Sequence, residues 1–192
     1  MTRPFRSPLR LRNLFLALPL ALAVWSLFSI RYNRFLMASA GHLLRLTERG
    51  HVTQFLAHPQ DLNRAYLSRL DFPPRRRLVA QFRITDVHFN LVLVLALFLA
   101  VPAVPWQKRF AQLGYACLAA ALFHLLLLFF YAKTVYATQL GAWSIVHYGP
   151  VARNIYGMTW HLLDLPVKLA LPFLLWIVFN YDRLPAVRRA AS

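Results

Sequence analysis

Four long apolar stretches constrain the fold of this chain more than any other feature of its sequence. They cover residues 14–30, 89–106, 110–132 and 165–181, and most of the charged residues around them are basic. A helix needs roughly 17–25 mostly apolar residues to cross the hydrocarbon core of a bilayer, and each stretch is of that length. The sequence therefore predicts an all-α membrane protein with four transmembrane helices and a small mixed α/β extracytoplasmic loop region.

The charge of the chain also fits a membrane location. Its 22 Lys and Arg outnumber its six Asp and Glu, which gives a formal net charge of +16, although 59% of the residues are hydrophobic. A nucleic-acid-binding protein carries its basic residues on one face of a soluble domain. Here they crowd beside the apolar stretches, where anionic lipid headgroups lie. We therefore expect contact with anionic lipid and no nucleic-acid partner.

Basic residues in the short segments between spans predict the orientation, because Lys and Arg favour the cytoplasmic side. If the chain crosses the membrane four times, three segments lie on the same side of it: the leader before the first span, the turn between the second and third spans, and the tail after the fourth. Their basic residues are Arg3, Arg6, Arg10 and Arg12, then Lys108 and Arg109, then Arg183, Arg188 and Arg189. Both termini are therefore predicted to be cytoplasmic.

Residues 1–30 contain a basic leader and the first apolar stretch, which is also the pattern of a signal peptide. A small-residue cleavage site, Ala38-Ser39-Ala40, follows. Arg31 and Arg34 lie before that site, where cleavable signals are usually uncharged. We therefore predict an uncleaved signal anchor, with cleavage as the alternative.

The loop 31–88 is predicted to form the extracytoplasmic region. Its first part, 32–49, has the pattern of an amphipathic helix that either continues the first span or lies on the headgroups. A short helix is predicted over 59–70. Alternation of residue types over 78–85 predicts a strand, for which 51–55 is a weak partner candidate.

The segment 133–164 separates the paired spans of 89–132 from the last span and basic tail of 165–192. It is predicted to form two short helices at the outer interface, with a turn at Gly149-Pro150. Aromatic residues are typical of such an interface. Those of this segment are Tyr136, Trp143, Tyr148, Tyr156 and Trp160.

Cys117 is the single cysteine of the chain and lies seven residues before His124 in the third span. The two share a helix face, so a membrane cysteine enzyme using Cys117 with His124 or Arg153 is an alternative function. At 1.5 Å per residue they are about 10 Å apart along the helix, and no acid flanks the thiol. We therefore interpret Cys117 as a packing residue and expect no catalytic residue and no cofactor.

Three further polar residues lie in or beside the spans. His124 is interpreted as neutral and bonded to another helix, because no second ionisable residue lies deep in a span. Asp164 and Lys168 have the spacing of a helical ion pair. The alternative is a transporter subunit in which His124 and Lys168 line a path. Asp86 and His88 could cap a helix or supply half of a metal site, but two ligands without a third do not predict a metal.

The run Arg75-Arg76-Arg77 follows two prolines and is a candidate for binding a protein partner or anionic lipid, because Arg binds carboxylates and phosphates bidentately. The alternative is a solvated loop. Other candidates for the same binding face are Arg83, Trp143, Arg153 and Trp160.

Residues 83–105 place the end of the predicted strand directly before an apolar helix that begins His-Phe-Asn and ends in Pro. This pattern, the chain length, the arginine-rich anchor and the long outer loop resemble the small membrane proteins associated with exosortase H. The resemblance implies a bacterial inner-membrane location and a non-catalytic accessory role. It also implies an exosortase partner, a polytopic enzyme that processes proteins bearing a C-terminal sorting signal. No catalytic residue carries over from it.

Overall fold

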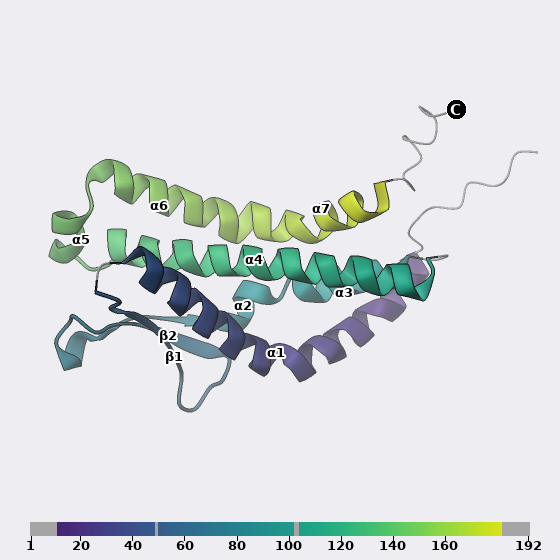
Figure 1. Ribbon diagram of the computed structural model, residues 1–192, viewed down its shortest axis with the longest axis horizontal. Helices are drawn as coiled ribbons and strands as arrows, with labels where there is room; N and C mark the ends of the chain where they lie inside the picture. The colour runs from purple at the N-terminus through teal and green to yellow at the C-terminus, as the bar shows by residue number, and fades with distance from the viewer. Residues whose placement is uncertain (1–10, 49, 102–103, 182–192) are drawn as a thin grey trace, which may run out of the picture. The chain divides into compact units, whose positions relative to one another are not determined.

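The computed structural model describes residues 11–48, 50–101 and 104–181 (Figure 1). The leader arginines up to Arg10 and the tail arginines from Arg183 onward lie outside the described residues. The orientation predicted from them stays a prediction.

Among the described residues, three helices are long and apolar enough to cross a membrane. They are α1 (Leu11–Thr47), α4 (Trp106–Thr138) and a continuous run of α6 (Pro150–Leu162), the π-helical turn η2 (Leu163–Val167) and α7 (Lys168–Asn180). Their most apolar windows are only 17%, 28% and 6% buried within the protein. So much exposed apolar surface is compatible with a membrane protein, because lipid can cover what water cannot.

The second apolar stretch forms a shorter helix than predicted. It comprises α2 (Ile84–His88) and α3 (Leu91–Ala100), and 1.5 Å per residue gives the pair about 25 Å, less than a hydrocarbon core of about 30 Å. The helix ends because Val101 precedes Pro102 and is extended, with φ −70° and ψ 116°. Four spans are therefore not confirmed.

A three-stranded antiparallel sheet follows α1, with the order β1 (Thr53–Ala57), β2 (Arg64–Arg69), β3 (Leu78–Arg83). The predicted strand is confirmed in β3. The predicted helix over 59–70 is wrong, because β2 occupies its second half. Ala65 and Leu67 are both fully buried, which is the two-residue period of a strand.

The turn before β2 explains why no helix starts there. The carboxylate of Asp61 accepts a hydrogen bond from the Asn63 amide at 2.9 Å, and the Asp61 carbonyl accepts one from Arg64 N. Asp61 therefore closes a tight turn instead of capping a helix. The weak candidate 51–55 overlaps β1, which pairs with β2 and not with β3.

The described residues form two compact units, of which the first is helical. This helical unit contains the described residues up to Leu27, Asn90–Ala120 and those from Leu169 onward. Small side chains of α1 and α3 form one of its cores, namely Ala17, Ala21, Val92, Ala96 and Ala100. Small residues let membrane helices approach closely. Side chains also bond to free helix-end carbonyls, from Asn13 to Ala100 O at 3.3 Å and from Gln112 to Phe179 O at 2.7 Å.

The second unit, the sheet unit, contains Phe28–Phe89 and Ala121–Lys168. Its sheet packs on the adjoining parts of α1 and α4, and one shared core comprises Leu36, Ala40, Ala65, Ile84, Leu127 and Leu128. The loop region therefore obtains its core from the helices, which a segment of its size could not supply alone. The predicted amphipathic helix is the continuation of α1 to Thr47, one of the two alternatives expected.

The segment 133–164 differs from the predicted pair of short interfacial helices. Helix α4 extends through it to Thr138, and the short α5 (Ala142–His147) follows. Gly149-Pro150 forms the predicted turn, but α6 then continues into α7 instead of ending. Tyr136 is fully buried within the protein, and the interfacial place expected for it stays a prediction.

Candidate functional site

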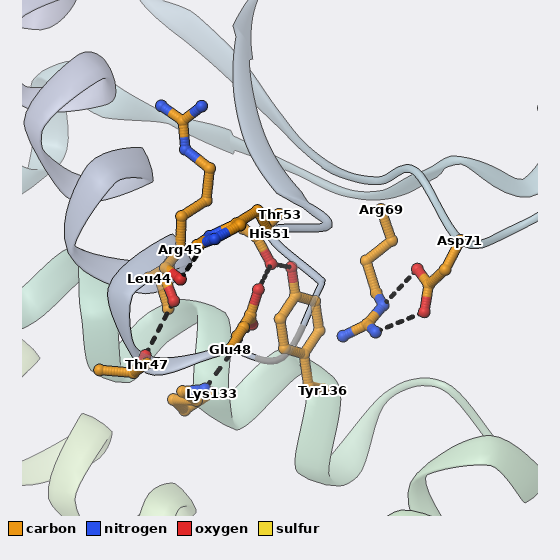
Figure 2. Close-up of polar contacts among 10 residues, drawn as sticks. All are labelled: Leu44, Arg45, Thr47, Glu48, His51, Thr53, Arg69, Asp71, Lys133 and Tyr136. Carbon is orange, nitrogen blue, oxygen red and sulfur yellow. Dashed lines mark hydrogen bonds and ion pairs between the residues drawn. The ribbon is translucent and has the colours of Figure 1, made fainter.

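A buried ion pair joins the residue after α1 to the last part of α4. Glu48 Oε1 lies 3.6 Å from Lys133 Nζ, and the two side chains are 9% and 11% exposed. Figure 2 shows the pair beside Thr53 and Tyr136. Charges this deep are found paired, because an isolated buried charge is very costly.

Glu48 is also the end of a hydrogen-bond chain. Thr53 Oγ1 donates to Glu48 Oε2 at 2.5 Å and lies 2.7 Å from the Tyr136 hydroxyl (Figure 2). The Thr53 hydroxyl has one proton, which goes to the carboxylate, so the Tyr136 hydroxyl must donate to Thr53. These two hydrogen bonds hold the loop between α1 and β1 in position.

Arg69, the last residue of β2, holds a second ion pair. Its Nε and Nη2 donate to the two carboxylate oxygens of Asp71 at 3.0 Å and 2.6 Å. Its guanidinium also lies over the rings of Tyr136 and Trp143, at 4.6 Å and 4.4 Å from their centroids. Bidentate pairing and ring stacking together are characteristic of Arg and not of Lys.

The electrostatics of this pair follow from its geometry. Burial opposes the charged form of Arg69, but the hydrogen bonds and charge of Asp71 outweigh it, so the pKa of Arg69 is raised. Burial likewise opposes the charged form of Asp71, and Arg69 outweighs it, so the pKa of Asp71 is lowered. Both groups therefore stay ionised at neutral pH.

An open cleft of about 310 Å³ lies among these groups. Its lining comprises Glu48, Val52, Arg69, Lys133, Trp143, His147 and Tyr148. The Trp143 and His147 rings stack at 4.1 Å, and burial raises the pKa of Tyr148. The cleft combines charged groups of both signs with an aromatic wall, which suits it to binding a small polar ligand.

A second polar cluster lies deeper in the sheet unit. His88 Nε2 is 2.6 Å from Asn33 Oδ1, and the Tyr32 hydroxyl is 2.9 Å from His124 Nδ1. Asn33 Nδ2 donates to Leu62 O, so its oxygen faces His88 and His88 Nε2 carries the proton. The predicted bond from His124 to another helix is present. The fully buried His88, which precedes the second apolar stretch, is a second ionisable residue near His124, with ring centroids 6.3 Å apart.

The remaining polar candidates are placed as follows. Asp164 and Lys168 form the expected ion pair at 2.5 Å. Asp86 is exposed and pairs with Arg83 at 3.9 Å, whereas His88 is buried, so these two do not share a metal site. Cys117 is half-buried in α4 and belongs to the helical unit.

The candidate binding residues do not come together in one site. Arg75, Arg76 and Arg77 are exposed around a 3-10 turn (Pro74–Arg76), and Arg83 is exposed at the end of β3. Trp160 packs on Tyr131, with ring centroids 5.1 Å apart. Arg153 Nε is buried without a hydrogen-bond partner among the described residues. Of the predicted binding residues, Trp143 lines the cleft.

Sequence reasoning missed the charged residues of the cleft. Glu48 is the only Glu of the chain, and Lys133 is one of three Lys and directly follows an apolar stretch. Their rarity was a usable signal, because a single acid among many bases is expected to be paired. Arg69 carried no signal of this kind, since it is one of ten Arg between residues 31 and 83.

Comparison with protein-family models, with curated protein sequences and with solved structures finds no match for this chain.

Proposed function

We propose that this chain is a non-catalytic accessory protein of the bacterial inner membrane that binds a membrane-protein partner through its sheet. The observation that carries this proposal is the edge strand β3, which continues from a turn of three exposed arginines. An edge strand presents unpaired backbone N–H and C=O groups, which a strand of another protein can pair with.

The sheet is held firmly enough to serve as a binding platform. Ala65 of β2 and Ile84, directly after β3, are fully buried in the core that includes Leu36 and Leu127 of the long helices. The side chains of Leu78, Gln81 and Arg83 remain exposed along β3. A partner strand would therefore meet a preformed edge, which lowers the ordering cost of binding.

An exosortase-type envelope protein-sorting system is the proposed setting. Support comes from the resemblance of residues 83–105 and of the arginine-rich anchor to proteins associated with exosortase H. The partner would then be a polytopic membrane enzyme of that system, and anionic lipid headgroups would be a second contact of the exposed arginines.

Site-specific photo-crosslinking in native membranes tests the binding face. A photoreactive residue at Gln81, on β3, is expected to form an adduct with another membrane protein. Gln60 is exposed in the turn between β1 and β2, and the same residue placed there is the matched control. Identical adducts at both positions, or none at Gln81, would contradict a binding face at β3.

The proposed orientation has a separate test. A topology reporter fused after Ser192 is expected to report the cytoplasm, and one inserted near Gln60 the outside. A cytoplasmic signal near Gln60 would overturn the extracytoplasmic placement of the sheet, whatever the crosslinking shows.

A further inference from the structure

The cleft of the sheet unit contains a buried carboxylate whose hydrogen bonding is incomplete. Glu48 Oε2 accepts from Thr53, but Oε1 is buried without a hydrogen-bond partner among the described residues. Its neighbour Lys133 is at ion-pair distance, 3.6 Å, which is too long for a hydrogen bond. A buried acceptor left unpaired is costly, so Oε1 is a place where a ligand N–H would be stabilised.

Lys133 and Arg69 supply the complementary donors. The ammonium of Lys133 has three donors, and its contacts among the described residues are the long ion pair with Glu48 and the face of Phe129 at 5.5 Å. Arg69 uses Nε and Nη2 for Asp71, and no hydrogen bond from its Nη1 is found among the described residues. Both cations line the cleft.

The charges lining the cleft select the sign of the ligand. Arg69 and Lys133 are cations and Glu48 is an anion, while Asp71 is not part of the lining. An anionic group is therefore favoured at the two cations. The ligand also needs a hydrogen-bond donor beside this anionic group, so that it can donate to Glu48 Oε1.

The aromatic wall and the size limit the rest of the ligand. Trp143, stacked on His147, and the Tyr148 ring, tilted by 54° from Trp143, form a partly apolar side. The volume of about 310 Å³ is at the low end of small-molecule sites. That is space for one amino-acid-sized group and not for a folded segment.

We propose that this cleft binds the α-carboxylate end of an amino acid or peptide. The carboxylate is held by Lys133 and Arg69, the N–H on the adjacent carbon donates to Glu48 Oε1, and the side chain lies on the Trp143–His147 stack. Phosphate has no side chain to lie on the Trp143–His147 stack, and a simple amine would face two cations. This binding goes beyond the accessory role and does not depend on it, because the cleft residues are distinct from β3 and the exposed arginines.

A ligand series on the full-length protein in detergent tests the proposal without any variant. Isothermal titration calorimetry compares N-acetylvaline, N-acetylvalinamide, free valine and inorganic phosphate. N-acetylvaline or valine is expected to bind at least about tenfold more tightly than the amide, which lacks the charge. Tighter binding of N-acetylvaline identifies a peptide terminus as the source, and tighter binding of valine a free amino acid. Equal binding of the amide, tightest binding of phosphate, or no binding of either acid would overturn the proposal.

Variants then locate the site. Lys133→Met is expected to weaken binding of the preferred acid at least about tenfold, whereas Lys108→Met, in an exposed position of the helical unit, should leave it unchanged. Because loss of Lys133 could also unfold the unit, Val52→Phe fills the cleft and keeps every charge. Val52→Phe should abolish binding with little change in melting temperature. Unchanged affinity in Val52→Phe would place the ligand elsewhere and refute the assignment.

Discussion

Arg69 and the run Arg75-Arg76-Arg77 lie in the same loop region but have opposite environments. Arg69 is buried, paired bidentately with Asp71 and stacked on two rings. The three others are exposed around a turn, where Arg77 Nε donates a hydrogen bond to the Phe72 carbonyl at 3.3 Å. The clustered arginines that sequence reasoning chose, Arg75-Arg76-Arg77, are therefore solvated. The arginine that lines the cleft is Arg69, which lies at the end of β2.

Removal of a buried arginine and removal of an exposed arginine are expected to have different effects. Removing a buried charge leaves its partner unpaired in a poorly solvated place. Removing an exposed charge changes long-range attraction, which salt screens within about 8–10 Å. We therefore expect stability to depend on the buried groups, and the contacts made with other molecules to depend on the exposed arginines.

The largest effect is expected from Glu48→Gln, because it leaves Lys133 buried without a counter-charge. The loss should be about 3 kcal/mol of unfolding free energy, read as a lower midpoint in thermal unfolding of the detergent-solubilised protein. The double change Glu48→Leu with Lys133→Met should recover much of it, since no charge is then left unpaired. A Glu48→Gln protein as stable as the parent would show that this pair is not an important contact.

The next largest loss of unfolding free energy, about 2 kcal/mol, is expected from Arg69→Gln. It removes both the bidentate pair and the contacts with the Tyr136 and Trp143 rings. Arg69→Lys keeps the charge but cannot reproduce the bidentate geometry, so it should fall between Arg69→Gln and the parent. Arg75→Gln is the matched control on the exposed side, and a midpoint shift as large as that of Arg69→Gln would show that the buried and exposed arginines contribute equally to stability.

Tyr136→Phe should lower the unfolding free energy by about 1 kcal/mol in the same thermal unfolding measurement, because it removes the hydroxyl that donates to Thr53. The ring stays, so the stacking with Arg69 is retained. Tyr156→Phe serves as comparison, since Tyr156 is only half-buried. Equal small losses in both variants would indicate that the hydrogen-bond chain to Glu48 adds nothing.

Acid should weaken the Arg69–Asp71 pair in a defined direction. The pKa of Asp71 is lowered in the folded protein, so its contribution is full above the ordinary value of 3.8 and is lost as pH falls through the lowered folded value. Asp71→Asn removes that contribution at every pH. The gap in unfolding free energy between parent and Asp71→Asn should therefore stay constant at higher pH and narrow below about pH 4, and a gap that widens on acidification would contradict this expectation.

The smallest effect on stability is expected when Arg75, Arg76 and Arg77 all become Gln, within about 0.5 kcal/mol. Retention of anionic lipid or of a protein partner should nevertheless decrease, and the difference from the parent should be largest at low salt. Co-purification at two salt concentrations measures this. The double change Arg31→Gln with Arg34→Gln, at exposed positions of α1, controls for loss of charge alone. Equal recovery at both salts would leave the triplet as a solvated turn.

Sequence alone predicted the features that depend on local pattern. Runs of apolar residues predicted the three long helices, since length and composition decide whether a helix can face lipid. Alternation predicted β3, and a four-residue spacing predicted the Asp164–Lys168 pair, because both follow from the geometry of a single element.

Tertiary structure decided everything that joins distant segments. β2 became a strand because Ala65 and Leu67 are buried on helices α1 and α4, which overrides the local helical pattern. Glu48 meets Lys133, and His88 lies beside His124, only because the chain returns through the sheet unit between them. Pairing of buried polar groups depends on the positions of whole elements, and no spacing within one segment carries that information.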